Sequence, residues 1–534
     1  MPQLKGGQAV VQALIREGVE VLFGIPGVHT LEIYDALYDN AHIRPIQARH
    51  EQGAAFMADG YARVAGKVGV ALVITGPGVT NAATAIGQAY ADGSPLLVIS
   101  SEVDSRHRGK GNLHELKDQL GMTRAIAKWS VRAESVVDIP RRIHQAMRKV
   151  WEGWPGPVHV EIPIDVLGEE GEVQFPPPAE RQRPPADAEA VTRAAELLAG
   201  ATHPLIFAGW GVTLADANEE LVRLAEHLQA PVLTNPLGKG AMPENHPLAL
   251  GSAWRNEGAI AHLLQETDVA LAVGSRLGAM DTRGWSLPLP ERLIHIDPEE
   301  SNIGRCYPTA LGLVGDPKVV LGQLLEVLGA DERPARYQEI AAARDEIAAR
   351  LWERSPEAAQ LLGALRAALG AGARLCMDMT LPTYWAATYL PVYEPKSFIN
   401  AYSFMALGCG LPTAIGAQIA EPQRPVVVVC GDGGLLFTVQ ELATAAKYGL
   451  DITVLLCNND CYGAIRRHQE RRYEGRVVDA DLTNPDFVTL ATAFGAAAQR
   501  IASPEALPAA LQEAVKAGGL RLIEVPIHEL PTPW

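Results

Sequence analysis

The amino-acid sequence predicts an α/β protein of three doubly wound domains, each with a parallel sheet covered by helices. Three observations support this prediction. The chain has 534 residues, which is too long for one ordinary hydrophobic core. Short apolar, β-branched runs alternate with alanine-rich helical stretches along the chain. Two stretches rich in charge or proline interrupt this alternation and divide the chain into three blocks.

The first interruption, residues 168–187, is rich in proline and charged residues and follows a strand-like apolar segment at 158–164. The second, residues 330–357, is polar and rich in alanine, arginine and glutamate, which predicts a helical connection. The predicted domains are therefore residues 1–168, 188–330 and 360–534.

Within each block, the apolar runs have the length of buried strands. In the first block, residues 68–75 and 96–101 lie on either side of an alanine-rich stretch at 81–90. The strand candidates of the other two blocks are residues 204–208, 269–273, 293–296, 426–430 and 452–457. Continuous apolar strands separated by helices are typical of parallel sheets that are covered on both faces.

Composition and charge restrict the class of protein. With 48% hydrophobic and 20% charged residues, the chain is globular in composition. Its net charge of −16 repels phosphate backbones and anionic lipid, so we expect neither a nucleic-acid partner nor a membrane partner. The basic stretch 466–476 also contains Glu470 and Glu474, which favours a solvated, salt-bridged face over an anion site.

The cysteines and the N-terminal segment predict a cytoplasmic protein. The six cysteines form no CxxC pair and no short disulfide framework, so we expect reduced and mostly buried thiols. Residues 1–11 lack the pattern of a signal peptide, and no segment offers 18 uninterrupted apolar residues.

The strongest chemical signal lies in the third block. Gly431-Asp432-Gly433 directly follows one apolar strand candidate, and Asn458-Asn459 follows the next. Both segments should therefore lie at the carboxyl edge of the sheet, where open α/β sheets bind ligands. Asp432 and Asn459, with one backbone carbonyl, are hard oxygen ligands suited to Mg²⁺, and the glycines allow a close approach to phosphate.

With this spacing, the sequence resembles the superfamily of thiamine-diphosphate-dependent decarboxylases and acetohydroxyacid synthases. The resemblance implies that Asp432, Asn459 and the carbonyl of Cys461 bind Mg²⁺, which in turn holds the cofactor diphosphate. The residues of this region that the resemblance assigns to the cofactor are Gly431, Asp432, Gly433, Gly434, Asn459, Cys461, Tyr462 and Gly463.

Two more segments resemble the same superfamily. Residues 49–63 match its pyrimidine-binding motif, which implies that Glu51 promotes deprotonation of the cofactor. Without the resemblance, a glutamate at this helix start is more often a capping or surface residue. In residues 403–415, the resemblance implies that Leu407 bends the cofactor, and that the backbone of Met405 and Leu407 holds its pyrimidine ring. On pattern alone, Leu407 is a core residue.

The resemblance extends over nearly the whole chain and gives each block a role. The first block becomes the pyrimidine-binding domain, the second a central Rossmann-like domain, and the third the diphosphate-binding and Mg²⁺-binding domain. In the family, the pyrimidine and diphosphate motifs of each site come from two different chains. A homodimer is therefore the minimum expected unit, and a homotetramer is common in the family.

Within the superfamily, residues 24–37, 49–81 and 109–119 most resemble the 5-guanidino-2-oxopentanoate decarboxylases, and the third block resembles benzoylformate decarboxylase. The implied function is decarboxylation of a 2-oxo acid to an aldehyde and CO₂. The alternative is a carboligase like acetolactate synthase or benzaldehyde lyase. Acetohydroxyacid synthases differ from this chain at residues 113–116 and at His468, and a non-enzymatic role is disfavoured by Glu51, Asp432 and Asn459.

Two histidines are candidates for proton transfer. His29 occupies the position of a histidine in benzaldehyde lyase, and His114 could serve similarly, although either could instead be a structural residue.

Two further questions concern the substrate and a second cofactor. If the substrate carries a guanidinium, its candidate partners are Glu115, Asp118 and Glu470. Some relatives keep an FAD-like topology in the central block, which leaves FAD open as a second cofactor. This block has only the fragment Gly209-Trp210-Gly211 in place of a complete GxGxxG, so FAD is not predicted.

Overall fold

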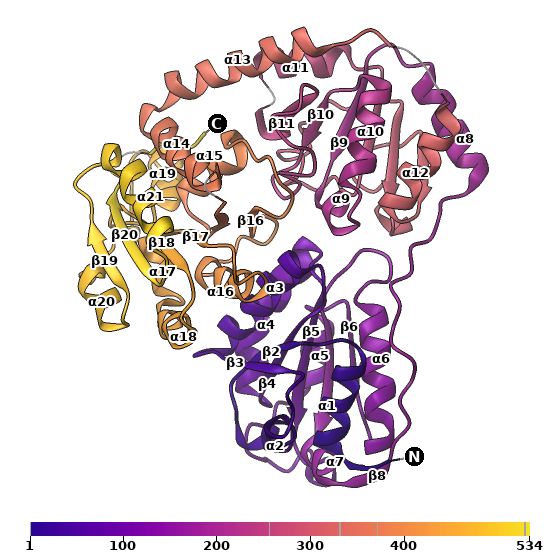
Figure 1. Cartoon of the computed structure of the whole chain (residues 1–534), viewed down its shortest axis with the longest axis vertical. Coiled ribbons are helices and arrows are strands. Elements are labelled where there is room, and N and C mark those ends of the chain that lie inside the picture. Colours follow the sequence, from indigo (N-terminus) through magenta and orange to yellow (C-terminus); the bar gives the residue numbers. More distant parts are fainter. Residues whose placement is uncertain (1, 256, 330–332, 371, 528–529, 534) are drawn as a thin grey trace.

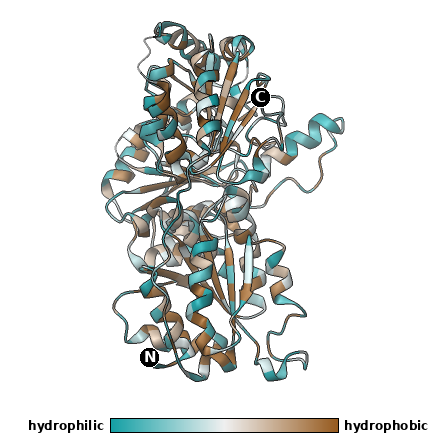
Figure 2. Ribbon diagram, turned by 90° about the vertical axis from the view of Figure 1, so that its right-hand side faces the viewer, coloured by the Kyte–Doolittle hydropathy of each residue, from teal (hydrophilic) through white to brown (hydrophobic). Residues whose placement is uncertain are grey.

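The computed structural model describes residues 2–255, 257–329, 333–370, 372–527 and 530–533. It contains three domains, each built around a six-stranded sheet in which every neighbouring pair of strands is parallel (Figure 1). Helices flank each sheet, and apolar residues concentrate in the strands (Figure 2). The predicted fold class, three doubly wound α/β domains, is confirmed.

The first sheet has the strand order β3-β2-β4-β5-β7-β6. Its strands are β2 (Val21–Gly24), β3 (Arg44–Gln47), β4 (Gly69–Val73), β5 (Leu96–Glu102), β6 (Trp129–Arg132) and β7 (Val158–Pro163). Its helices are α1 (Gly6–Arg16), α2 (Leu31–Tyr38), α3 (Glu51–Ala65), α4 (Pro77–Asp92), α5 (Gln119–Arg124), α6 (Ile139–Lys149) and α7 (Ile164–Gly168). The order reverses between β2 and β4, which is where such sheets bind ligands.

The central sheet has the order β11-β10-β9-β12-β13-β14, the strand arrangement of a Rossmann fold. Its strands are β9 (Pro204–Ala208), β10 (Val232–Thr234), β11 (Ala249–Ser252), β12 (Val269–Val273), β13 (Leu293–Asp297) and β14 (Leu311–Val314). Its helices are α8 (Ala188–Ala199), α9 (Trp210–Leu214), α10 (Asn218–Leu228), α11 (Gly258–Glu266) and α12 (Pro317–Leu328).

The third sheet repeats the topology of the first, with the order β16-β15-β17-β18-β20-β19. Its strands are β15 (Arg374–Met377), β16 (Phe398–Asn400), β17 (Val426–Gly431), β18 (Ile452–Asn458), β19 (Ala497–Arg500) and β20 (Arg521–Pro526). Its helices are α14 (Pro356–Gly370), α15 (Leu381–Tyr389), α16 (Gly410–Ala420), α17 (Asp432–Leu436), α18 (Leu442–Tyr448), α19 (Gly463–Arg472), α20 (Phe487–Ala493) and α21 (Leu507–Ala517).

The two interruptions of the sequence pattern have different structures. Helix α13 (Tyr337–Arg354) runs from the central domain toward the third, as the alanine-rich composition predicts, while residues 330–332 lie outside the described residues (Figure 1). The sequence predicts no strand in residues 168–187, but β8 (Glu170–Glu172) pairs with β1 (Gln3–Lys5) in an antiparallel ribbon. This short strand is mostly exposed, so it carries no apolar signal.

Helices α3 and α16 join the first and third domains of one chain into a common core. Their backbones touch at two glycines: a Cβ atom at Gly60 would overlap the carbonyl of Thr413, and one at Gly416 would overlap the carbonyl of Met57. The central domain has a hydrophobic core of its own. The first and third domains therefore form one packed unit, to which the central domain is attached.

All six cysteines are free thiols and four of them are buried, as the sequence predicts. In the part of the chain that the structure describes, no helix combines the length and the apolar character needed to cross a bilayer.

Candidate active site

A cavity of about 270 Å³ opens at the carboxyl edge of the third sheet, beside the reversal of strand order between β15 and β17. It gathers every residue of this domain that the sequence assigns to cofactor binding. These residues are Met405, Leu407, Gly431, Asp432, Gly433, Gly434, Asn459, Cys461, Tyr462 and Gly463. The remaining lining residues are Met379, Thr380, Leu381, Tyr384, Ala464, Ile465 and Ile527.

The two polar segments reach the cavity because each ends a buried strand. Strand β17 is buried over its whole length and delivers Asp432 as the first residue of α17. Strand β18 is paired with it in register, Gly431 opposite Cys457, so that Asn459 follows at the same edge. Asp432 is only 2% exposed, and burial raises the pKa of its carboxyl group.

Asn484 is a residue of this site that the sequence did not reveal. Its side-chain Nδ2 donates hydrogen bonds to Asp432 Oδ2 at 2.8 Å and to Asp460 Oδ1 at 2.9 Å. It thus holds two carboxylates close together, an arrangement that favours binding of a cation. Asn484 lies in a loop without a recognisable motif, so only the fold identifies it.

Asp378 is a second residue of this site that the sequence did not reveal. Its carboxylate holds the backbone beside the cavity. Its side chain, 1% exposed, follows β15, and its Oδ1 accepts hydrogen bonds from the backbone N–H groups of Met379 at 2.6 Å and Gly408 at 3.0 Å. Burial raises the pKa of this carboxyl group to about 6. The contact with Gly408 fixes the backbone next to Leu407. In the same loop, Met405 has a left-handed φ of 58°, a conformation that non-glycine residues adopt rarely.

Glu51 lies in the first domain, at the start of α3. The side chain of His50 caps this helix by accepting a hydrogen bond from the backbone N–H of Gln52. The half-buried Glu51 accepts one at 2.9 Å from the side chain of Asn81 on α4. Glu51 does not line the cavity of the third domain, nor does any other described residue that precedes Met379.

His29 and His114 lie side by side in the first domain. Their rings pack edge to face with centroids 5.3 Å apart, and the Nδ1 atom of each is buried without a hydrogen-bond partner among the described residues. Burial lowers the pKa of His29, and the neighbouring His114 lowers it further. The neutral imidazole is therefore the favoured form of His29 at neutral pH.

The loop that carries His114 is fixed by a buried glutamine. Gly76, which follows β4, packs against the carbonyl of His114 and donates its N–H to Gln119 Oε1 at 2.8 Å. Gln119 also donates to Glu161 Oε2 at 3.0 Å. This network places His114 beside His29, and the sequence alone did not assign Gln119 that role.

The three carboxylates considered for a guanidinium already have partners within the chain. Glu115 accepts hydrogen bonds from several backbone N–H groups of its own loop, among them Gly111 at 2.8 Å. Asp118 caps α5, and Glu470 pairs with Arg466. Arg466, the first residue of the basic stretch, also pairs with Asp481. Each of these carboxylates therefore stabilises local structure.

Large apolar side chains are exposed beside both groups of candidate residues. Val28 and Leu113, more than 60% exposed, adjoin His29 and His114 in sequence. In the third domain, Ile465 at the cavity and Phe437 after α17 are also exposed. Contact with a second molecule would remove these apolar side chains from water.

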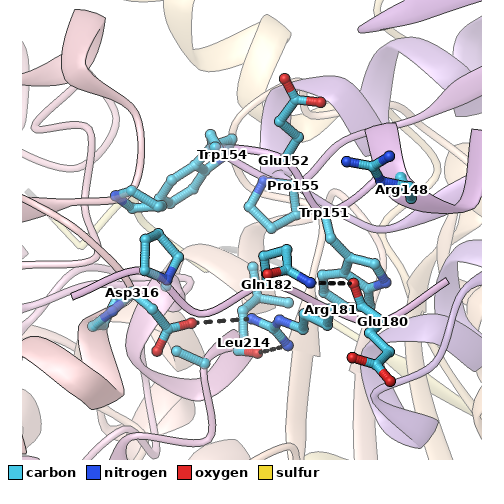
Figure 3. Close-up of a pocket in the computed structure, with 16 residues that line it drawn as sticks. Arg148, Trp151, Glu152, Trp154, Pro155, Glu180, Arg181, Gln182, Leu214 and Asp316 are labelled. Carbon is cyan, nitrogen blue, oxygen red and sulfur yellow. Dashed lines mark hydrogen bonds and ion pairs between the residues drawn. The ribbon is translucent and has the colours of Figure 1, made fainter. Parts of the chain in front are cut away.

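Another cavity, of about 180 Å³, lies where the central domain meets the first domain and the segment that joins them (Figure 3). The guanidinium of Arg181 is already engaged there, stacked on Trp151 at 4.2 Å and donating to the carbonyl of Leu214 at 2.8 Å. At this edge, Gly209 and Gly211 pack against the backbone of Gly274. These glycines thus serve close packing between a helix and the sheet.

Comparisons with known proteins agree with the three-domain arrangement. Residues 4–122 match the N-terminal TPP binding domain of thiamine pyrophosphate enzymes, residues 191–324 the central domain, and residues 378–525 the C-terminal TPP binding domain. A probable 2-ketoarginine decarboxylase (AruI) of Pseudomonas aeruginosa is 41% identical over 98% of this chain and 94% of its own length.

Two other relatives are named as acetolactate synthases. A probable acetolactate synthase large subunit of Methanocaldococcus jannaschii is 34% identical over 99% of this chain and 93% of its own length. The large subunit of acetolactate synthase isozyme 3 of Escherichia coli is 34% identical over 97% of this chain and 93% of its own length.

Proposed function

Because this chain belongs to the thiamine pyrophosphate enzyme family, we propose that it decarboxylates a 2-oxo acid to an aldehyde and CO₂, with thiamine diphosphate and Mg²⁺ as cofactors. One observation carries the proposal: the cavity of the third domain gathers all ten residues assigned to the cofactor in that domain. When bound, the cofactor accepts the electron pair that the departing CO₂ leaves behind.

The donor set of the cavity fits a magnesium diphosphate. We propose Asp432, Asn459 and the carbonyl of Cys461 as the Mg²⁺ ligands, because they are hard oxygen donors at one edge of the cavity. The carboxylate of Asp432 is buried and shares the Asn484 amide with Asp460. A cation would stabilise its charged form, which burial disfavours. Gly433 and Gly434 line the cavity, and because they have no side chain a phosphate can approach their backbone closely.

We propose that each complete site forms between two chains, with Glu51 of one chain facing the cavity of the other. This arrangement accounts for the absence of Glu51 from the described lining of its own chain's cavity, and for the exposed apolar side chains beside both groups. A homodimer is the minimum unit, and the family resemblance favours a tetramer. The free thiols fit a cytoplasmic enzyme.

Within this site, Glu51 would hold the proton that activates the cofactor, and Asn81 would orient the Glu51 carboxyl group. We propose His29 or His114 as the group that moves a proton to or from the reacting substrate carbon. Their contact supports a shared role, since each ring packs on the other and a depressed His29 pKa provides a neutral base at neutral pH.

For the substrate, we propose 5-guanidino-2-oxopentanoate, on the basis of the relative named 2-ketoarginine decarboxylase and of the resemblance in the first block. Glu115, Asp118 and Glu470 are bound within their own chain, so none of the three is proposed as the guanidinium partner.

A second candidate function is the joining of two 2-oxo acids, because several relatives are named acetolactate synthases. Residues 113–116 differ from the Ala-Phe-Gln-Glu run of acetohydroxyacid synthases, and the exposed His468 replaces their tryptophan. Both differences argue against this alternative.

The test is a panel of 2-oxo acids assayed with thiamine diphosphate and Mg²⁺: pyruvate, branched-chain, aromatic and guanidino compounds. We expect CO₂ and aldehyde in equal amounts, fastest with the guanidino compound. Acetolactate as the main product from pyruvate would establish the alternative function instead. Activity that is independent of added cofactor, in protein freed of it, would contradict the proposal.

A further inference from the structure

Glu441 is a buried carboxylate of the third domain that neither the sequence motifs nor the proposed chemistry uses. It ends the short 3-10 helix at Val439–Glu441, directly before α18, and its side chain has no exposed surface. Burial raises the pKa of its carboxyl group, while the hydrogen bonds it accepts lower it. A buried carboxyl group with this many donors has a defined structural task.

The donors come from the backbone immediately before Glu51. Glu441 Oε1 accepts hydrogen bonds from the N–H groups of Arg49 at 3.1 Å and His50 at 3.0 Å. Its Oε2 accepts from the hydroxyl of Thr444 at 2.7 Å. A Cβ atom at Gly53 would collide with the Glu441 carboxylate, so the start of α3 lies directly against it.

Helix α18 makes further hydrogen bonds to the same segment at Gln47, the last residue of β3. The hydroxyl of Tyr448 accepts a hydrogen bond from the Gln47 N–H at 2.8 Å, and Lys447 donates to the Gln47 side chain at 2.6 Å. The Thr444 hydroxyl, which donates to Glu441, also lies 3.4 Å from the Gln47 carbonyl oxygen. The segment between β3 and α3 is thus held at its α3 end by Glu441 and at its β3 end by residues of α18.

We propose that Glu441 is a positioning residue for Glu51: its carboxylate fixes the backbone of Arg49 and His50, and thereby the angle at which α3 presents Glu51. The proposal rests on the proposed function, in which Glu51 activates the cofactor of the neighbouring chain. Glu441 touches neither cofactor nor substrate and acts through the backbone.

Removal of the Glu441 carboxylate should displace Glu51 while leaving the Glu51 side chain intact. In Glu441→Ala, the N–H groups of Arg49 and His50 lose their acceptor and the first turn of α3 can shift. In Glu441→Gln, the amide oxygen can still face both N–H groups, and the Thr444 hydroxyl can turn to accept from the amide nitrogen. The alanine variant should therefore be impaired and the glutamine variant largely restored.

The first measurement is hydrogen–deuterium exchange at C2 of bound thiamine diphosphate, compared across variants. Glu441→Ala should slow this exchange by about 10²-fold, the loss expected for a reacting group displaced by about 1 Å. Its affinity for thiamine diphosphate with Mg²⁺ and its KM should stay near the wild-type values while kcat falls. Glu513→Ala, which removes an exposed carboxylate from α21 of the same domain, is the control and should match wild type.

The second measurement uses the protein without cofactor. Amide exchange of the peptide that spans residues 47–53, followed by mass spectrometry, should accelerate in Glu441→Ala and stay near wild type in Glu441→Gln. If the alanine variant does not fold, Glu441→Asp replaces it: the shorter carboxylate keeps the charge but cannot reach both N–H groups, so C2 exchange should still be slow.

A wild-type rate of C2 exchange in Glu441→Ala or Glu441→Asp, with exchange slowed in Glu51→Gln, would overturn the role of Glu441 alone. A wild-type rate in Glu51→Gln would overturn both this inference and the proposed role of Glu51.

Discussion

Arg63 on α3 is a buried cation where the first domain meets the third. Its side chain is 3% exposed and its Nε donates to both Asp59 oxygens at 3.0 Å. Its two other nitrogens donate to Asp92 at 2.7 Å and to the carbonyl of Asn400 at 3.0 Å. Burial opposes the charge of Arg63, yet the two aspartates raise its pKa above the ordinary value.

The same network reaches the loop that carries Leu407. Asp92 accepts a hydrogen bond from the N–H of Ser403 at 3.0 Å, and Gln88 accepts one from Ala406 at 3.2 Å. Loss of Arg63 should therefore loosen both the domain joint and this loop of the cavity.

The substitution Arg63→Met keeps the apolar stem and removes the charge, which leaves two buried carboxylates without their cation. Breaking a buried ion pair in this way costs about 3–5 kcal/mol. For a domain of about 150–250 residues, each kcal/mol of lost stability lowers the midpoint temperature of unfolding by about 2–4 °C. We therefore expect this temperature to fall by roughly 6–20 °C.

Differential scanning calorimetry of the variant, compared with the wild type, is the assay. The control is Lys67→Met, which breaks an exposed pair with Glu20 and should cost less than about 1 kcal/mol. If the unfolding midpoint of Arg63→Met fell as little as that of the control, the buried network would contribute no more to stability than a surface pair, contrary to this prediction.

Three further predictions concern the metal, the proton shuttle and pH. Asp432→Ala should abolish Mg²⁺-dependent binding of thiamine diphosphate in calorimetric titration; undiminished affinity would place the metal elsewhere. His29→Ala should keep the cofactor but lose about 10²–10⁴-fold in turnover; a loss below about tenfold would make His29 structural and His114 the candidate. Burial lowers the pKa of His159 to about 3, so stability should fall as pH drops below the unfolded value near 6.5, by about 2 kcal/mol at pH 5. In urea unfolding, the free energy of unfolding of His159→Gln should lack most of this fall at low pH. An equal fall in that variant would show that His159 is not its cause.

The parts of the fold and site that the sequence predicts are those encoded locally. The apolar run at 426–430 and the Gly-Asp-Gly that follows it lie next to each other in the chain, and β17 with Asp432 appears where the pattern indicates. The same holds for β9 and for the start of α3 at Glu51. Strand ends and turn glycines are short-range features, so they can be read without the fold.

The features that the sequence did not reveal depend on residues far apart in the chain. Glu441 binds the backbone of Arg49 across 392 residues, and Gln88 binds Ala406 across 318. Neither side chain belongs to a pattern that distinguishes it from a surface residue. Their roles follow from the contact between the first and third domains, which single-sequence periodicity does not specify.

We propose that each active site combines Glu51 of one chain with Asp432 of another, and mixing of two variant subunits distinguishes this arrangement from a site within one chain. Glu51→Gln and Asp432→Ala, each inactive alone, would be co-expressed with different tags, and the mixed dimer isolated through both. In that dimer one site carries both defects and the other carries none, so it should recover about half of the wild-type decarboxylase activity per dimer. If the site lay within a single chain, every site would carry one defect, and the mixed dimer would remain as inactive as either parent.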